Sequence, residues 1–241
     1  MRKIESLKDF DTKIFADGAN IDGIFEMYEK EWVSGLTTNP TLMKKSGVKN
    51  YREFAGEVLK VVQKKPISFE VFSDDFQEMK RQALEIAEWG DNVFVKIPIT
   101  NTRGASSGDL IESLSTSGVK LNVTAIMTTD QVKLALSRLS HDIENFVSVF
   151  AGRIADTGQD PLNLMKNCLE VIGETSKNKL IWASPREFLN LVQANSIGCH
   201  IITMSNDLLA KAKLLNKDLS EYSLETVKMF YEDAKSAGYE L

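Results

Sequence analysis

The sequence predicts a single-domain (β/α)8 barrel, an α/β fold of the TIM-barrel type, with an additional C-terminal helix. Two observations lead to this prediction. Short apolar runs alternate with longer segments of helical periodicity along the whole chain, which is typical of parallel strands joined by crossover helices. Eight such units fit into 241 residues, a common size for a closed barrel. We therefore expect one domain over residues 1–241.

Eight short runs rich in strand-forming residues are the predicted strands. In chain order they are KIFAD from Lys13, GLTTN from Gly35, ISFEVF from Ile67, NVFVKIP from Asn92, KLNVTAIM from Lys120, FVSVFAG from Phe146, LIWAS from Leu180 and HIITM from His200. An open doubly wound sheet is the alternative arrangement of these elements. Such a sheet more often carries a glycine-rich phosphate loop after an early strand, and neither GxGxxG nor the P-loop pattern occurs here. The closed barrel is therefore preferred.

Amphipathic segments between these runs are the predicted helices, and most end at a glycine or a polar cluster. The clearest span residues 21–31, 76–90, 130–140, 160–174 and 185–198. The loop 100–108 is the most flexible-looking segment, and because it follows the fourth strand it is either an active-site loop or an ordinary surface loop.

Beyond the eighth strand, apolar residues again recur at helical spacing. Leu224, Val227 and Tyr231 predict a final helix. Ser223 offers a possible N-cap for it. The helix is expected either to cover the barrel or to reach a neighbouring subunit.

Composition excludes several classes of protein. The net charge of −5 argues against a broad nucleic-acid surface, although a small anion pocket is compatible with it. Cys168 and Cys199 lie far apart and there are only two histidines, so we expect neither a disulfide framework nor a zinc site. No apolar segment reaches the roughly 20 residues that span a bilayer, and the N-terminus carries no signal core. A cytoplasmic protein without a membrane partner is expected.

A lysine interrupts the apolar run NVFVKIPIT. An ammonium taken out of water is costly unless it is paired or loses its proton. Lys96, if buried and neutral, could attack a carbonyl and form a Schiff base. The ordinary alternative is a stem lying on apolar surface with its head in water, and this stretch alone favours that alternative.

Polar residues recur where the other predicted strands end, which is where the chemistry of a (β/α)8 barrel collects. Asn122 and Thr124 share a face because they lie two apart on one strand, and so do Ser148 and Phe150. The whole polar set is Asp17, Asn39, Glu70, Lys96, Asn122, Thr124, Ser148, Ser184 and Arg186.

Several of these residues also have a purely structural explanation. Asp17 and Asn39 are residue types common in turns and helix caps. Glu70 could pair with a structural lysine, and the side chains of the fifth strand could satisfy backbone groups. Ser184 could cap a helix that begins at Pro185.

The two arginines of this region, Arg153 and Arg186, could simply be solvated. Against all these separate explanations stands the recurrence of one polar set at the same relative position along successive strands. This recurrence favours a shared pocket.

These segments, in this order, resemble the transaldolase family, including its short fructose-6-phosphate aldolase-like branch. The matching segments are KIFADGAN, GLTTNP, VKIP, KLNVTAIMT, VSVFAGRIADTG, WASPRE and ITMSNDLLAKAK. Together they are far more specific than any single motif. The resemblance implies a (β/α)8 barrel that performs class I aldol chemistry on sugar phosphates, in carbohydrate metabolism such as the pentose phosphate pathway. It implies no metal and no other cofactor.

The resemblance also implies a role for each polar residue. Lys96 is expected to form the Schiff base, and Asp17 to take the proton of the donor hydroxyl as the carbon–carbon bond breaks. Glu70 and Thr124 are expected to hold the water that shuttles protons during Schiff-base formation. The expected substrate-binding residues are Asn39, Asn122 and Ser148 for the dihydroxyacetone part, Phe150 beside them, and Arg153, Ser184 and Arg186 for the phosphate.

The branch of the family decides the reaction. Glu70 and Phe150 resemble transaldolases, whereas the aldolase branch tends to have glutamine and tyrosine there. We therefore expect a transaldolase that moves a dihydroxyacetone unit from sedoheptulose 7-phosphate or fructose 6-phosphate to an aldose phosphate. Gly18 departs from the DTAN or DTSN opening of the short members, which leaves the exact sugar open. The alternatives are a fructose-6-phosphate aldolase and a catalytically silent sugar-phosphate-binding protein, and a homo-oligomer is compatible with each.

Overall fold

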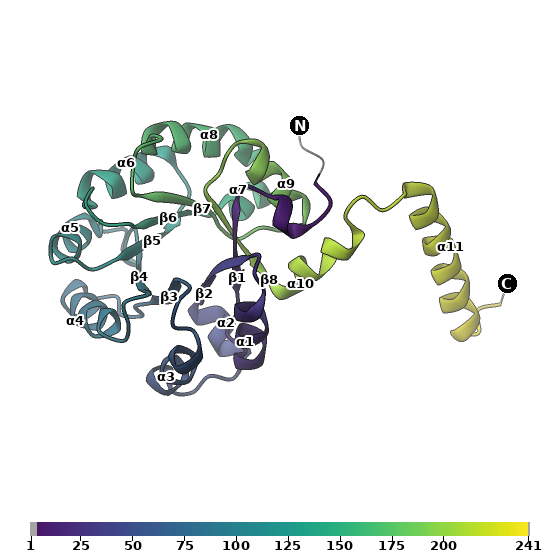
Figure 1. Ribbon diagram of the computed structural model, residues 1–241, viewed down its shortest axis with the longest axis horizontal. Helices are drawn as coiled ribbons and strands as arrows, with labels where there is room; N and C mark the ends of the chain where they lie inside the picture. Colours follow the sequence, from purple (N-terminus) through teal and green to yellow (C-terminus); the bar gives the residue numbers. More distant parts are fainter. Residues whose placement is uncertain (1–3, 241) are drawn as a thin grey trace.

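The computed structural model describes residues 4–240, and the predicted domain bounds of 1–241 run past this range at both ends. Its strands form one closed, parallel barrel in chain order, which Figure 1 shows from one end. They are β1 Lys13–Asp17, β2 Val33–Thr37, β3 Ile67–Glu70, β4 Val93–Pro98, β5 Leu121–Ile126, β6 Phe146–Val149, β7 Lys179–Trp182 and β8 Ile201–Ser205. Because β1 pairs with β8 along its whole length, the barrel prediction is confirmed and the open sheet is wrong.

The strands are buried on both faces, which is why they read as nearly continuous apolar runs in the sequence. Inside the barrel, the rings of Phe94 and Phe146 stack with their centroids 4.0 Å apart, and Phe15 meets Phe146 edge-on. Gly35 makes room for Phe15, since a Cβ there would lie 2.5 Å from the ring. These three aromatic residues lie at or before the midpoints of their strands, so the polar ends of the strands form the opposite mouth of the barrel.

Most of the helices cover the outside of the barrel (Figure 1). In chain order the helices are α1 Ile21–Glu29, α2 Pro40–Lys45, α3 Tyr51–Val61, α4 Phe76–Ala87, α5 Gly108–Thr116, α6 Thr129–Arg138, α7 Ala151–Asp156, α8 Pro161–Ile172, α9 Leu189–Ser196, α10 Asn206–Leu209 and α11 Leu219–Ser236. Short 3-10 turns occupy Leu7–Asp9 and Ala210–Leu214. Many of the helices begin at an Asn or Asp whose side chain accepts a backbone amide, as the capping rules lead us to expect.

Two details of the predicted helices are wrong. The helix expected over 185–198 begins only at Leu189, so Ser184 caps no helix. The final helix begins at Leu219 and not after Ser223, because the carboxylate of Asp218 accepts the amides of Ser220 and Glu221 and starts the helix earlier. The loop 100–108 is held by hydrogen bonds from the amides of 103 and 105 to the side chain of Asn101.

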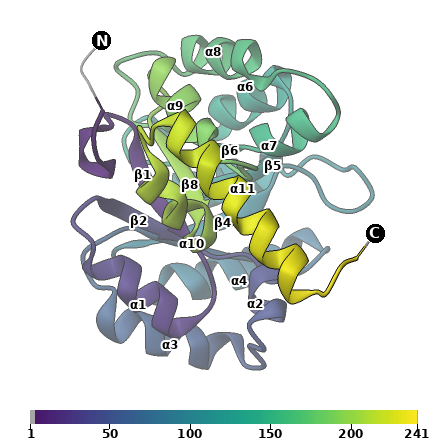
Figure 2. The same cartoon turned by 90° about the vertical axis from the view of Figure 1, so that its right-hand side faces the viewer.

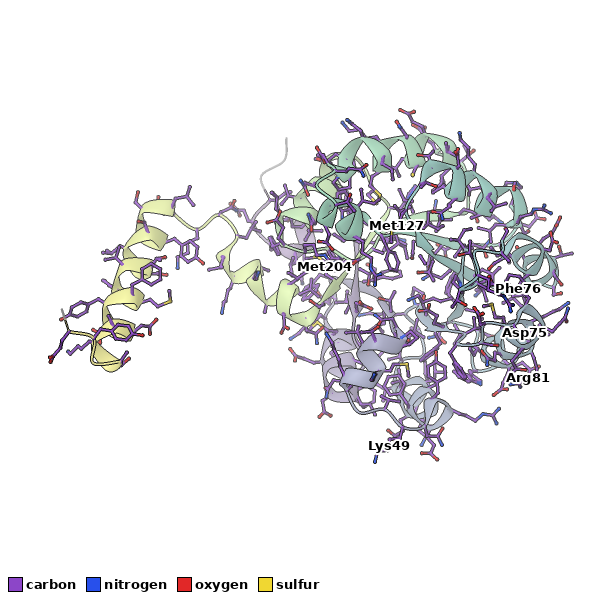
Figure 3. The ribbon with its side chains drawn as sticks, turned by 180° about the vertical axis from the view of Figure 1, so that it is seen from behind. Lys49, Asp75, Phe76, Arg81, Met127 and Met204 are labelled. Carbon is purple, nitrogen blue, oxygen red and sulfur yellow. The ribbon has the colours of Figure 1, made fainter. Side chains whose placement is uncertain are left out.

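Helix α11 stands away from the barrel, and Figure 2 views the molecule from the side on which it projects. None of its residues is buried. In Figure 3 its side chains extend into open space, with no other helix or strand of the described chain packed along it. The expectation that this helix covers its own barrel is therefore wrong. Among the described helices, none is both long enough and apolar enough to cross a membrane.

Candidate active site

The register of the strands brings the predicted polar residues together at one mouth of the barrel. Glu70 on β3 is level with Lys96 on β4, and Lys96 is level with Asn122 on β5. Thr124 lies two residues further along the same strand. Neighbours in register project on the same side of a sheet, so these side chains converge inside the barrel.

Lys96 is buried, with 6% of its surface exposed. Its ammonium nitrogen lies 3.0 Å from a carboxylate oxygen of Glu70 and donates a hydrogen bond of 2.9 Å to the backbone oxygen of Thr38. The alternative in which the lysine head reaches water is therefore wrong. The pairing also satisfies a buried charge and places a proton acceptor next to the amine.

Asp17 ends β1 on the same mouth of the barrel. One of its carboxylate oxygens accepts a hydrogen bond of 2.8 Å from the hydroxyl of Thr37, and the amide of Asn39 lies 3.5 Å from the other. Burial raises the pKa of Asp17, and the charge of Lys96 opposes this shift. Asn39 is also the N-cap of α2, so the cap explanation is confirmed for it, while its amide group still faces Asp17.

A chain of side-chain hydrogen bonds crosses the barrel beside Lys96. The hydroxyl of Ser148 donates to the oxygen of Asn122, 2.7 Å away, and the amide nitrogen of Asn122 donates to Ser68 over 3.0 Å. Thr124 is equally buried, and its hydroxyl has no hydrogen-bond partner among residues 4–240. Neither Asn122 nor Thr124 forms a side-chain hydrogen bond with a backbone group of the described residues, so the purely structural explanation for these two residues is wrong.

The ends of β6 and β7 meet at the side of this mouth. Phe150 precedes α7, and the guanidinium of Arg153 lies 5.2 Å from the centre of its ring. Ser184 has a φ of 60°, the left-handed region, and its backbone oxygen would lie 1.6 Å from a Cβ at residue 152, so only glycine fits there. This close approach fixes α7 against the chain that follows β7.

Arg186 is not simply solvated. Its guanidinium pairs with the carboxylate of Asp156 at the end of α7, and its Nε lies 3.0 Å from one oxygen of that group. The guanidinium holds the pKa of Asp156 below its usual range. Both side chains remain about half exposed, so the pair lies at the surface of the mouth.

Within residues 4–240, His, Cys, Asp and Glu never gather in groups of three or more that could hold an ion. The cluster at the mouth instead joins two carboxylates, Asp17 and Glu70, to one amine, Lys96. This arrangement is suited to proton transfer around a nucleophilic lysine.

A comparison with known families agrees with this chemistry. The family described as Transaldolase/Fructose-6-phosphate aldolase matches residues 14–241 of the chain. The chain belongs to this family. Membership places it among enzymes that transfer aldehyde or ketone groups, and it confirms the resemblance carried by the motifs.

Curated relatives match this chain over most of their length. A protein of Thermoanaerobacter sp., named a probable transaldolase, is 34% identical over 95% of this chain and 100% of its own length. Another from Nitrosopumilus maritimus, with the same name, is 32% identical over 93% of this chain and 96% of its own. A third, from Dehalococcoides mccartyi and also named a probable transaldolase, is 36% identical over 80% of this chain and 86% of its own length.

Among solved structures, a dihydrodipicolinate synthase family protein from Coccidioides immitis superimposes with a TM-score of 0.61. The superposition covers 91% of this chain and 74% of that one at 10% sequence identity. At this identity the likeness shows the fold alone. It agrees with the closed barrel.

The structure adds residues to the site of this family member that sequence reasoning missed. Ser68 lies two residues before Glu70, so the alternation of a strand could have placed it on the same face. Thr37 and Thr38 lie in the GLTTNP motif, but their contacts with Asp17 and Lys96 depend on the closure of the barrel. Asp156 follows Arg153 by three residues on α7, and nothing in the sequence pairs it with Arg186.

Proposed function

We propose that this protein is a transaldolase, which transfers a dihydroxyacetone unit from a ketose phosphate to an aldose phosphate through a Schiff base on Lys96. The donors that we assign are sedoheptulose 7-phosphate and fructose 6-phosphate. One observation carries the proposal: the only charged partner within ion-pairing distance of the buried Lys96 amine, among residues 4–240, is the carboxylate of Glu70. A buried amine beside a proton acceptor is the arrangement that nucleophilic attack on a carbonyl requires.

The reaction follows from this arrangement. Lys96 gives its proton to Glu70, and the neutral amine adds to the ketose carbonyl. The carbinolamine hydroxyl then takes that proton back and leaves as water, which gives the protonated imine. Asp17 then takes the proton of the hydroxyl next to the carbon–carbon bond that breaks. The electron pair of that bond moves into the protonated imine and gives an enamine. The aldose phosphate leaves, an acceptor aldehyde enters, and the enamine carbon attacks it while Asp17 returns the proton. Hydrolysis of the imine frees the product and Lys96.

Proton transfer in the first and last steps is assigned to a water held by Glu70 and Thr124. The buried Thr124 hydroxyl supports this role, because a buried hydroxyl without a protein partner is costly unless it binds water or substrate. Asn39, Asn122 and Ser148 are assigned to the hydroxyl groups of the dihydroxyacetone part, and Phe150 lines the same space.

The substrate phosphate is assigned to Arg186, Ser184 and Arg153. The pairing of Arg186 with Asp156 engages Nε and Nη2 of the guanidinium, so we assign Nη1 to a phosphate oxygen. Asp156 then holds the guanidinium in place rather than competing for it.

The first test is chemical trapping. The protein is incubated with fructose 6-phosphate, borohydride is added, and any adduct is mapped by mass spectrometry. We expect a reduced three-carbon adduct on Lys96. A folded protein without an adduct on any lysine would overturn the proposal and favour a silent sugar-phosphate-binding protein.

An acceptor-free assay separates the transaldolase from a fructose-6-phosphate aldolase. The aldolase releases free dihydroxyacetone without an acceptor, whereas the transaldolase needs an aldose phosphate to complete its turnover. Glu70 and Phe150, where the aldolase branch tends to have glutamine and tyrosine, favour the transaldolase. We place this activity in one domain over residues 1–241, in the cytoplasm and in the pentose phosphate pathway.

We further propose that the protein is a homo-oligomer in which α11 packs on a second copy. Exposed apolar residues occupy a wide arc of this helix, which Asp233 interrupts, while four of its six charged residues line the other side. The apolar set is Leu219, Tyr222, Leu224, Val227, Met229, Phe230 and Tyr231, and the charged set is Glu221, Glu225, Lys228 and Glu232. On the barrel, the side chains of Phe72 (65%) and Leu189 (51%) are also exposed.

The mass of the protein in solution tests this assembly. Light scattering on the full chain is expected to give a multiple of the 27.0 kDa protomer mass. The double variant Val227→Asp, Phe230→Asp should be monomeric, because two carboxylates cannot be buried unpaired at an interface. Glu232→Gln on the charged side is the matched control and should keep the wild-type mass. A monomeric wild-type protein would contradict the proposal.

A further inference from the structure

Strand β3 loses its neighbour β2 just before it reaches the catalytic glutamate. The pairing of β2 with β3 ends at Thr37 and Ser68, and the last bond from that side joins the amide of Thr38 to the oxygen of Ser68. On the other side, β3 stays paired with β4 as far as Glu70. Backbone groups alternate along a parallel strand, so the amide and carbonyl of Glu70 point toward the missing neighbour.

Tyr51 supplies the two missing hydrogen bonds. Its hydroxyl accepts the amide hydrogen of Glu70 over 2.8 Å and donates to the carbonyl oxygen of the same residue over 2.9 Å. One side chain thus replaces a residue of β2, with both a donor and an acceptor in the positions that a strand would provide. Burial raises the pKa of Tyr51, so the phenol keeps the proton that it donates.

The ring of Tyr51 is itself held in place. It lies at the start of α3 and packs edge-on against Phe69 and Phe72, with Trp89 tilted against it. The hydroxyl therefore has a fixed position relative to β3. Phe72, only two residues beyond Glu70, is 65% exposed, and the Tyr51 ring is one of the side chains that it packs against.

We infer that Tyr51 is a positioning residue that holds the backbone of Glu70 so that its carboxylate meets Lys96. The expected effect on the rate rests on the proposed function, whereas the expected effect on the position of the Glu70 carboxylate does not. The Glu70 carboxylate reaches Lys96 from the last residue of a strand, and Tyr51 binds both backbone groups that this residue turns toward β2. Without the hydroxyl, the backbone of Glu70 loses both hydrogen bonds on its β2 side, and the end of β3 is held only from the β4 side, where the amide of Val71 donates to the oxygen of Lys96.

Tyr51→Phe tests the inference because it keeps the ring and removes only the hydroxyl. We expect kcat to fall by about 10- to 100-fold, the cost of a displacement of about 1 Å in a catalytic group. KM should change little, because the assigned phosphate ligands lie on α7 and in the chain that follows β7, away from β3. The rate of borohydride trapping should fall with kcat, and the pH dependence of kcat/KM should shift, since Glu70 serves proton transfer.

Tyr28→Phe is the matched control, since it removes a hydroxyl from a partly buried tyrosine on α1 whose ring lies beside the amine of Lys65. A merely structural role for Tyr51 predicts a lower melting temperature with unchanged kcat and an unchanged pH profile. That result, with a wild-type adduct on Lys96, would overturn the inference and leave the proposed function standing.

A crystal structure of Tyr51→Phe decides the structural part even if the wild-type protein forms no adduct. The inference expects the Glu70 carboxylate to leave its position 3.0 Å from the Lys96 amine. A Glu70–Lys96 contact that is unchanged in the variant would overturn it.

Discussion

Replacing Lys96 with methionine is expected to lower turnover by at least about 10⁴-fold and to abolish the borohydride adduct, because the side chain that forms the covalent intermediate is gone. Methionine has a similar length and fills the same buried space, so the barrel interior keeps its volume. Turnover of an aldose phosphate and mass spectrometry of the trapped protein measure the two effects. A variant with near wild-type turnover would contradict the assignment.

The change also leaves Glu70 without its partner. Removing one member of a fully buried ion pair costs about 3–5 kcal/mol. The side chain of Glu70 keeps 18% exposure, so we expect a smaller loss. The double variant Lys96→Met, Glu70→Gln should recover stability and remain inactive, which separates folding from chemistry. Lys120→Met, just before the start of the neighbouring strand β5, is the matched lysine control and should retain activity.

Replacing Asp17 with asparagine is expected to lower kcat by about 10²- to 10⁴-fold, the usual contribution of a general base. The amide keeps the shape of the carboxylate and can still accept the hydrogen bond from Thr37. It cannot accept the proton of the donor hydroxyl. Schiff-base formation precedes this step, so we expect borohydride to trap an adduct of the intact donor on Lys96 while carbon–carbon cleavage is slow. An unchanged kcat would contradict the role, and Asp22→Asn, an exposed change on α1, is the control.

The same variant should be more stable than the wild type, by a margin that grows with pH. The pKa of Asp17 is raised in the folded protein, mainly by burial. Below the ordinary aspartate pKa of about 4, the carboxyl is neutral in both folded and unfolded chains. As pH rises through the folded-state pKa, the unfolded chain has already lost this proton, so the wild type loses stability that the asparagine variant keeps.

Urea unfolding of both proteins over a pH series measures this margin, and the other carboxylates cancel in the difference. The free energy of unfolding of the variant, minus that of the wild type, is expected to increase from pH 4 and then to level off above the raised pKa. A margin that does not depend on pH would contradict the raised pKa. A stable but slow variant would show that burial of Asp17 serves catalysis at the expense of stability.

Local sequence was sufficient to predict the fold. Each predicted strand overlaps an observed one, because a parallel strand buried on both faces is a continuous apolar run whatever surrounds it. The helix ends were less predictable. Ser223 and Asp218 are both good cap residues, and the choice between them depends on which amides lie within reach when the chain leaves the barrel.

The candidate site, like the fold, could be predicted in part from the sequence. Lys96, Glu70, Asp17, Asn122 and Thr124 could be predicted because their own strands carry them to one mouth of the barrel, and strand periodicity alone sets which way they face.

Contacts between distant segments were decided only by the tertiary structure. The hydroxyl of Tyr51 reaches Glu70 only because β2 stops short of the end of β3. Arg186 meets Asp156 only because Gly152 lets α7 approach the chain after β7. Side-chain periodicity is a local property of the backbone and can be predicted from the sequence, whereas a hydrogen bond between two segments far apart in the sequence depends on the closure of the whole barrel.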